Sequence, residues 1–175
     1  EGLTFNVIAV DGNLQNQVIP TDSLLMPPGR RYELLIYGPQ KGSYKLRTAD
    51  FDTGPDGDAY PGQIMATVVS QGDEVAPIPL PSQFPPVQDL RNTQLTGRRT
   101  VVFADSPNPN QFLIDGKQFN STCVDQLITL GSVEEWTIEN TSQEAHVFHI
   151  HQLDFQVTEV DGEPVPFTGH QDIGT

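Results

Sequence analysis

The sequence predicts an all-β chain, and three observations support this expectation. Glycine and proline are abundant, with 15 of each in 175 residues, and the apolar residues occur in short runs between them. No long segment repeats its apolar residues with the period of a helix. A chain of this length can bury one good core or two small, partly complete ones, and length alone does not choose between them.

Short apolar runs bounded by turn residues indicate where the strands lie. Asp11 and Gly12 follow the first run, and Asp115 and Gly116 follow a later one, in the manner of tight turns between strands. Residues 52–62 are rich in glycine and aspartate and are expected to form a loop. The strands are expected at residues 3–10, 31–37, 43–48, 64–70, 99–104, 112–114, 126–130, 133–139 and 147–160.

A proline-rich stretch interrupts the strand pattern in the middle of the chain. It includes the sequence APIPLPSQFPPVQ, which lacks the N–H donors that the interior of a sheet requires. We therefore expect a stiff, extended linker at residues 76–97. This linker would separate a first domain at residues 1–75 from a second at residues 98–175.

The net charge argues against a nucleic-acid partner, and the single cysteine excludes an internal disulfide. The formal net charge is −14, which would repel a phosphate backbone, so no nucleic-acid partner is expected. No apolar run approaches the length of a membrane span. Cys123 cannot form an internal disulfide because it is the one cysteine, and we interpret it as a free thiol.

Three of the four histidines lie within six residues, at His146, His149 and His151. Chance placement would produce such a cluster on the order of once in a thousand arrangements. In a strand, His149 and His151 would share one face, and His146 would point elsewhere because its parity is opposite. Neutral imidazole is a ligand for copper, zinc, iron and nickel alike, so the cluster predicts a transition-metal site without naming the metal.

The predicted strand at residues 147–160 also places apolar side chains on the face of the histidine pair. These are Leu153, Phe155 and Val157. An unpartnered imidazole is costly beside a buried apolar surface, which favours a metal or a firm hydrogen bond there. One alternative is a mononuclear zinc or iron enzyme in which His170 is the third ligand.

Three segments resemble the multicopper oxidases of the laccase type. Residues 134–157, EEWTIENTSQEAHVFHIHQLDFQV, resemble the start of the third cupredoxin domain of that family. Residues 112–117 are similar to a turn of the same domain, and residues 25–35, LMPPGRRYELL, to a segment of the second. The resemblance implies cupredoxin-like Greek-key β-sandwiches, one mostly complete in residues 1–75 and one truncated in residues 98–175.

The family's ligand motif H-x-x-H-x-H implies a role in copper binding for each clustered histidine. His146 would bind the type 1 copper, His149 the type 2 copper and His151 a type 3 copper. Such enzymes oxidise a small organic reductant and reduce dioxygen to water. With Met26 and Met65 as its only methionines, the sequence has no methionine-rich tract, which favours a phenol or aromatic amine as the reductant.

The chain also departs from the family pattern. The family has two further H-x-H pairs and an H-C-H-x-x-x-H segment, and none of these occurs here; Cys123 has no flanking histidine, and His170 lies outside every family motif. We therefore expect no oxidase turnover from the chain alone, and association with missing segments of the same protein or with another copy. A non-catalytic cupredoxin-like binding module is the second alternative. The resemblance further implies a location outside the cytoplasm.

Overall fold

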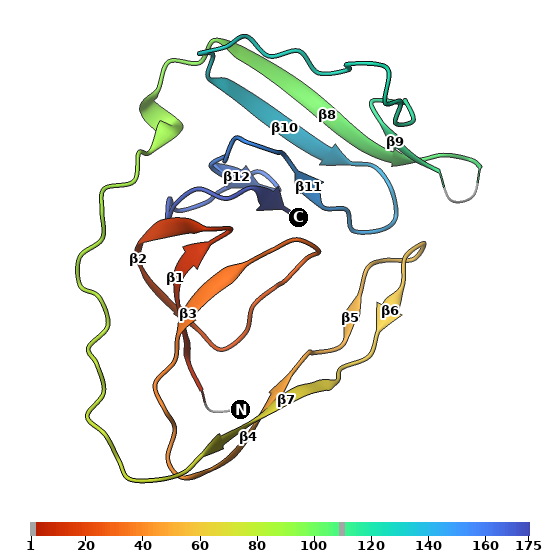
Figure 1. The fold of residues 1–175 in the computed structure, drawn as a ribbon. Coiled ribbons are helices and arrows are strands. Elements are labelled where there is room, and N and C mark those ends of the chain that lie inside the picture. Colours follow the sequence, from red (N-terminus) through yellow and green to blue (C-terminus); the bar gives the residue numbers. More distant parts are fainter. Residues whose placement is uncertain (1–2, 109–110) are drawn as a thin grey trace.

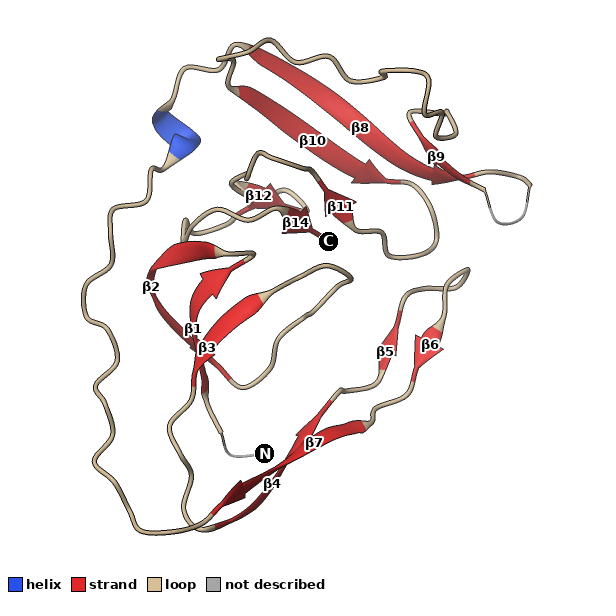
Figure 2. Cartoon of the chain, in the orientation of Figure 1, coloured by secondary structure: helices blue, strands red, loops and turns tan. Residues whose placement is uncertain are grey.

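The computed structural model describes residues 3–108 and 111–175, and it consists of strands and long connections (Figure 2). The predicted all-β class is confirmed, since the helical structure in the described residues is one 3-10 turn, η1 (Leu90–Asn92). None of the helical structure found there is long and apolar enough to cross a membrane. The first half contains β1 (Phe5–Val10), β2 (Asn13–Thr21), β3 (Tyr32–Leu35), β4 (Gly42–Arg47), β5 (Phe51–Asp52), β6 (Ala59–Tyr60) and β7 (Ile64–Ser70). The second half contains β8 (Gly97–Asp105), β9 (Phe112–Ile114), β10 (Glu134–Asn140), β11 (Phe148–His149), β12 (Glu159–Val160), β13 (Glu163–Pro164) and β14 (Ile173–Gly174).

The first sheet has the antiparallel order β2-β1-β3 and carries the best-buried apolar side chains of the first half. Val7, Ala9 and Val10 of β1 are all buried. Asp11 and Gly12 form the predicted turn, with φ values of 54° and 85°, the positive values that a two-residue hairpin of type I′ requires. Strand β2 was not expected from the sequence, because its apolar and polar residues alternate weakly.

Strands β4 to β7 form an arm below the first sheet (Figure 1). Strands β4 and β7 pair antiparallel, and β5 and β6 extend the arm as a short hairpin. The prediction of a plain loop at residues 52–62 is therefore wrong at its ends. The β5–β6 hairpin contacts the segment before the histidine cluster, where the Ala145 amide donates to the Thr53 carbonyl at 2.6 Å.

Residues 71–89 contain neither helix nor strand and run along the outside of the molecule (Figure 1). The segment ends at Asp89, which caps η1 by accepting a hydrogen bond from the Arg91 amide. Asp89 and Leu90 also bond to the two ends of the Gln156 amide group, at 2.9 and 2.7 Å. The division into domains at residues 75 and 98 stays a prediction.

The sheet β10-β8-β9 contains a parallel pair, β8 with β10, in register from Gly97↔Glu134 to Phe103↔Asn140. Arg99 of β8 lies 4.8 Å from the centre of the Trp136 ring and bonds to the Glu134 carboxylate. The same guanidinium donates to the Gln126 side chain and to the Leu127 carbonyl. Residues 126–130 form no strand, so the strand predicted there is wrong. The start of this segment is held by the Arg99 side chain and not by backbone pairing with another strand.

The long strand predicted at residues 147–160 is also wrong, because it is broken into β11 and β12. Gln152 between them has φ 68°, a left-handed conformation that ends the extended backbone. Leu153 is exposed, and Phe155 packs against Phe148, with ring centres 5.4 Å apart. The apolar face predicted beside the histidine pair is therefore absent from the described residues. Strand β11 pairs instead with β14, near the end of the chain.

Much apolar surface is left uncovered in both halves. The accessible surface is 12966 Å², whereas a compact chain of this mass would expose about 8,500 Å². Ile64, Met65 and Val69 of β7 are more than half exposed, as are Leu127 and Phe119. Apolar exposure of this extent is typical of surfaces that contact another polypeptide.

A tight turn before β3 places Gly29 directly against β14. The Arg30 amide donates to the Pro27 carbonyl, and Gly29 has φ 85°, as the third position of a type II turn requires. A Cβ at Gly29 would lie 2.7 Å from Cδ1 of Ile173, a buried residue of β14.

We expect Gly29→Ala to lower the free energy of unfolding more than Gly12→Ala does. Both glycines have φ 85°, so both substitutions carry the same backbone strain, about 1–2 kcal/mol. A Cβ at Gly12 meets nothing within 4 Å, whereas a Cβ at Gly29 displaces Ile173. Urea unfolding of the two variants measures the difference, and equal losses of stability would contradict the packing of Gly29 on β14.

Candidate metal centre

His149 and His151 lie side by side at the edge of the β11–β14 pair. Their ring centres are 4.8 Å apart, with the ring planes inclined by 60°. His149 belongs to β11, and His151 follows in the bend where the strand ends. The two imidazoles therefore lie close enough to bind one metal ion or two neighbouring ones.

A backbone carbonyl fixes the protonation pattern of His149. Its Nδ1 lies 2.7 Å from the Asp172 carbonyl oxygen. A carbonyl can only accept, so Nδ1 carries the proton, and in the neutral imidazole Nε2 then keeps its lone pair for a metal. This arrangement is common behind metal-binding histidines, because the second ring nitrogen needs a partner that orients the ring.

The histidine pair lines an open depression of about 380 Å³. Arg31, Asp154 and Asp172 contribute its charged groups. Arg31 donates to the Asp172 carboxylate at 2.7 Å, and this contact raises the pKa of Arg31. The mouth of the depression is thus polar, with one guanidinium facing two carboxylates. The lining residues are Arg31, His149, Ile150, His151, Gln152, Asp154 and Asp172.

His146 points to a different part of the molecule. Its ring stacks on Phe103 of β8 and meets the edge of Phe112 of β9, with ring centres 5.7 Å apart in both cases. Only 17% of the side chain is exposed, and the buried Nε2 atom has no hydrogen-bond partner. A buried nitrogen without a partner is costly in a fold that serves structure alone, and it is the state expected of a metal ligand without its metal.

Two carboxylates face the unpartnered nitrogen of His146. Asp105 and Glu144 lie 3.8 and 3.9 Å from Nε2. The ligand atoms of the three residues lie within 4.8 Å of one another, and this is the group of possible metal ligands that the described residues form. A thiolate is not part of it, since Cys123 lies in an exposed turn. Sequence reasoning missed both carboxylates, because Asp105 lies far from the histidine motif and Glu144, although it lies within the resembling segment, is not one of the family's ligand positions.

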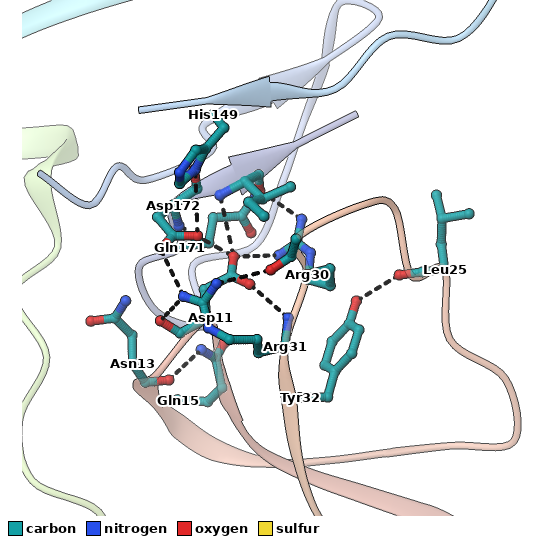
Figure 3. Close-up of polar contacts among 12 residues, drawn as sticks. Asp11, Asn13, Gln15, Leu25, Arg30, Arg31, Tyr32, His149, Gln171 and Asp172 are labelled. Atoms are coloured by element: carbon teal, nitrogen blue, oxygen red, sulfur yellow. Dashed lines mark hydrogen bonds and ion pairs between the residues drawn. The ribbon is translucent and has the colours of Figure 1, made fainter. Parts of the chain in front are cut away.

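A charged network behind His149 joins the first sheet to the end of the chain (Figure 3). The buried Asp11 carboxylate accepts from the Arg30 guanidinium at 3.0 Å and from the Asp172 and Ile173 amides, both at 3.2 Å. Arg30 also donates to the Ile173 carbonyl at 2.6 Å. The sequence carried no signal for this network, because Asp11 and Arg30 lie more than 140 residues away from Asp172 and Ile173.

His170 lies away from the histidine pair, in a loop before β14. Its Nε2 donates to the Gln88 carbonyl at 2.9 Å, and its ring packs near Phe167. Asp89, beside Gln88, has its pKa lowered by hydrogen bonds from Arg91 and Gln156. In the described residues, His170 belongs neither to the depression nor to the cluster around His146, which does not favour a site with His170 as third ligand.

Solved structures of two multicopper oxidases share the fold of this chain. A multicopper oxidase from Campylobacter jejuni, described as a metallo-oxidase, matches 99% of the chain with a TM-score of 0.79 at 23% identity. A laccase-like multi-copper oxidase from Ochrobactrum sp. matches 98% with a TM-score of 0.71 at 24% identity. The chain covers 41% of each. The fold is therefore that of the cupredoxin domains of multicopper oxidases, as the sequence predicted.

Sequence comparison gives the family. Residues 85–173 match the multicopper oxidase family, and this chain belongs to it. A laccase of Bacillus subtilis is 24% identical over 99% of the chain, and a laccase of Bacillus stratosphericus is 25% identical over 95%. The chain spans about a third of the length of these laccases, 34% and 33%. The copper assigned to each histidine stays a prediction.

We expect His146→Phe to leave the stability of the chain unchanged or to increase it. Phenylalanine fills the space between Phe103 and Phe112 and removes a buried nitrogen without a partner. His149→Phe is the matched variant, and it should cost about 1 kcal/mol because the Asp172 carbonyl loses its donor. Urea unfolding measures both, and a larger loss at His146 than at His149 would contradict this account of the buried nitrogen.

Proposed function

We propose that this chain supplies part of the copper-binding apparatus of a laccase-like oxidase and has no oxidase turnover by itself. The parent enzyme couples one-electron oxidation of phenolic or similar substrates to the reduction of dioxygen to water. His146 would bind the type 1 copper, His149 the type 2 copper and His151 a type 3 copper. The observation that carries the proposal is the separation of one buried, unpartnered imidazole from a neighbouring pair.

The chemistry of the donors supports copper at both places. Neutral imidazole is a good ligand for copper, and His149 has its Nε2 free because Nδ1 is bonded to a carbonyl. Bound copper supplies the one-electron redox chemistry that joins oxidation of the reductant to reduction of dioxygen. The residues of this chain hold and orient the ligand rings, and the Phe103 and Phe112 rings shield His146 from water.

Two observations support the proposal that the chain needs further ligand-bearing segments. Type 1 copper needs a thiolate, and the carboxylates of Asp105 and Glu144, rather than Cys123, lie around His146. The exposed apolar surface of β7 and of the segment before β10 is available to such segments. They would come from the rest of the same protein or from another copy. A location outside the cytoplasm stays part of the proposal.

The substrate class rests on a narrower basis. The relatives of known structure differ, since one is described as a metallo-oxidase and the other has oxidase activity towards lignin model compounds. With Met26 and Met65 as its methionines, this chain lacks a tract that would attract cuprous ions, so we favour the aromatic substrates.

Copper titration of the purified chain, with an absorption spectrum and oxygen uptake on the same sample, tests the proposal. We expect Cu²⁺ to bind without an intense blue thiolate band and without uptake of dioxygen in the presence of a phenol. His149→Ala combined with His151→Ala should weaken binding by more than about tenfold, since loss of a ligand's supporting partner already costs that much. His170→Ala is the control, because its ring bonds to Gln88 rather than facing the pair.

Two outcomes would contradict the proposal. Oxygen uptake by the chain alone, confirmed as a single species by intact mass, would show that it needs no further ligands. Copper affinity that falls equally in the His170 variant and in the double variant would show that the metal binds elsewhere.

A further inference from the structure

The orientation of His149 depends on a peptide group that belongs to the far end of the chain. The Asp172 carbonyl accepts the Nδ1 proton, and β14 begins at the next residue and pairs with β11. Strand β14 has two residues and the β11–β14 pair is correspondingly short, so its two registered residue pairs alone give a weak anchor. Other contacts must hold the Asp172 peptide in place.

Those contacts come from the turn between β1 and β2. The Asp11 side chain is fully buried, and its two oxygens accept from Arg30, from the Arg31 amide, and from the amides of residues 172 and 173. Three of these donors reach one carboxylate oxygen and the fourth reaches the other, so neither oxygen is without a partner. Asp11 has φ 54°, so its backbone is committed to the hairpin turn of the first sheet. The Asp172 peptide is therefore fastened to a rigid element of the other half.

Arg31 fastens the same residue from the side of the depression. Its guanidinium donates to the Asp172 carboxylate at 2.7 Å and to the Asp11 carbonyl at 2.9 Å. The other carboxylate oxygen of Asp172 is buried, has no hydrogen-bond partner, and lies 3.8 Å from Nδ1 of His149. Without Arg31, Asp172 keeps only its contact with Asp11 to the first half, so its carbonyl is no longer held firmly against Nδ1. An imidazole that loses this acceptor has no partner that selects the Nδ1-protonated tautomer.

We infer that Asp11 and Arg31 are positioning residues for the metal ligand His149. They hold the Asp172 carbonyl against Nδ1, which locks the ring in the tautomer that leaves Nε2 free for a metal ion. That Nε2 binds copper rests on the proposed function, whereas the tautomer of His149 is a property of the metal-free chain. The consequence is that residues in the turns beside the first sheet control metal binding at the edge of β11.

Histidine ¹⁵N chemical shifts of the metal-free chain at pH 8 test the inference directly, because they distinguish a protonated Nδ1 from a protonated Nε2. In the unaltered chain we expect His149 to carry its proton on Nδ1. In Arg31→Gln we expect a mixture of tautomers at His149. The Arg31 side chain is 54% exposed, so this variant should fold, which an unfolding curve verifies. Asp11→Asn is less suitable, because a buried charge network that loses one partner is strongly destabilised.

Arg98→Gln is the matched control, because Arg98 is also an exposed arginine paired with a carboxylate, that of Glu135 on β10. It should leave the His149 signals unchanged. Cu²⁺ titration of the same samples should show a loss of affinity of about 10–100-fold in Arg31→Gln and none in the control.

The outcomes separate the inference from the proposed function. A proton on Nε2 of His149 in the unaltered chain, or unchanged tautomers in Arg31→Gln, would overturn the inference. A shift in tautomer that also appears in the control would overturn the specific role of Arg31. A tautomer shift confined to Arg31→Gln, with copper binding that does not depend on His149, supports the positioning role and rejects the proposed function.

Discussion

The buried carboxylate of Asp11 is the interaction on which the arrangement of the two halves depends. It is surrounded by donors from the turn before β3 and from the peptide groups that begin β14. A carboxylate removed from water is tolerated only when it is hydrogen-bonded, so the donors from both halves stabilise the arrangement in which they meet it. That arrangement brings β14 beside β11, and thereby places the backbone that supports His149. The position of the candidate metal ligands thus follows from a contact between distant parts of the sequence.

The histidines differ in what surrounds them, and the difference has chemical meaning. His146 lies among aromatic rings, with low exposure and with carboxylates opposite its free nitrogen. His149 and His151 lie at an open, polar depression. Residues 146–151 therefore place one histidine in a site shielded from water and two in a site open to solvent. The strand ends after β11, and Gln152, which has a left-handed backbone, lines the same depression as the pair.

The sequence was sufficient for the fold class, for strands β1, β3, β4 and β7 to β10, and for the histidine cluster, because these follow from local patterns. The run at residues 3–10 and the Asp-Gly signal after it predicted β1 and its turn, which depend on neighbouring residues only. The uninterrupted strand expected at residues 147–160 was wrong because Gln152 adopts a conformation that its type does not reveal. Asp11, Arg31 and Asp172 were missed for a different reason. Their relation is made by the tertiary structure, and no spacing in the sequence encodes it.

The exposed connection between β7 and η1 has a consequence for the integrity of the protein. Val75 and Ile78 in this segment are almost fully exposed, and it belongs to no sheet. Exposed segments of this kind are the preferred sites of proteolytic cleavage. The contacts of Asp11 with the 172–173 peptides, and of Thr53 with Ala145, bypass this segment entirely. A cut there would leave two polypeptides joined by non-covalent contacts, so a nicked sample could keep its ligand geometry while it separates into two bands under denaturing conditions.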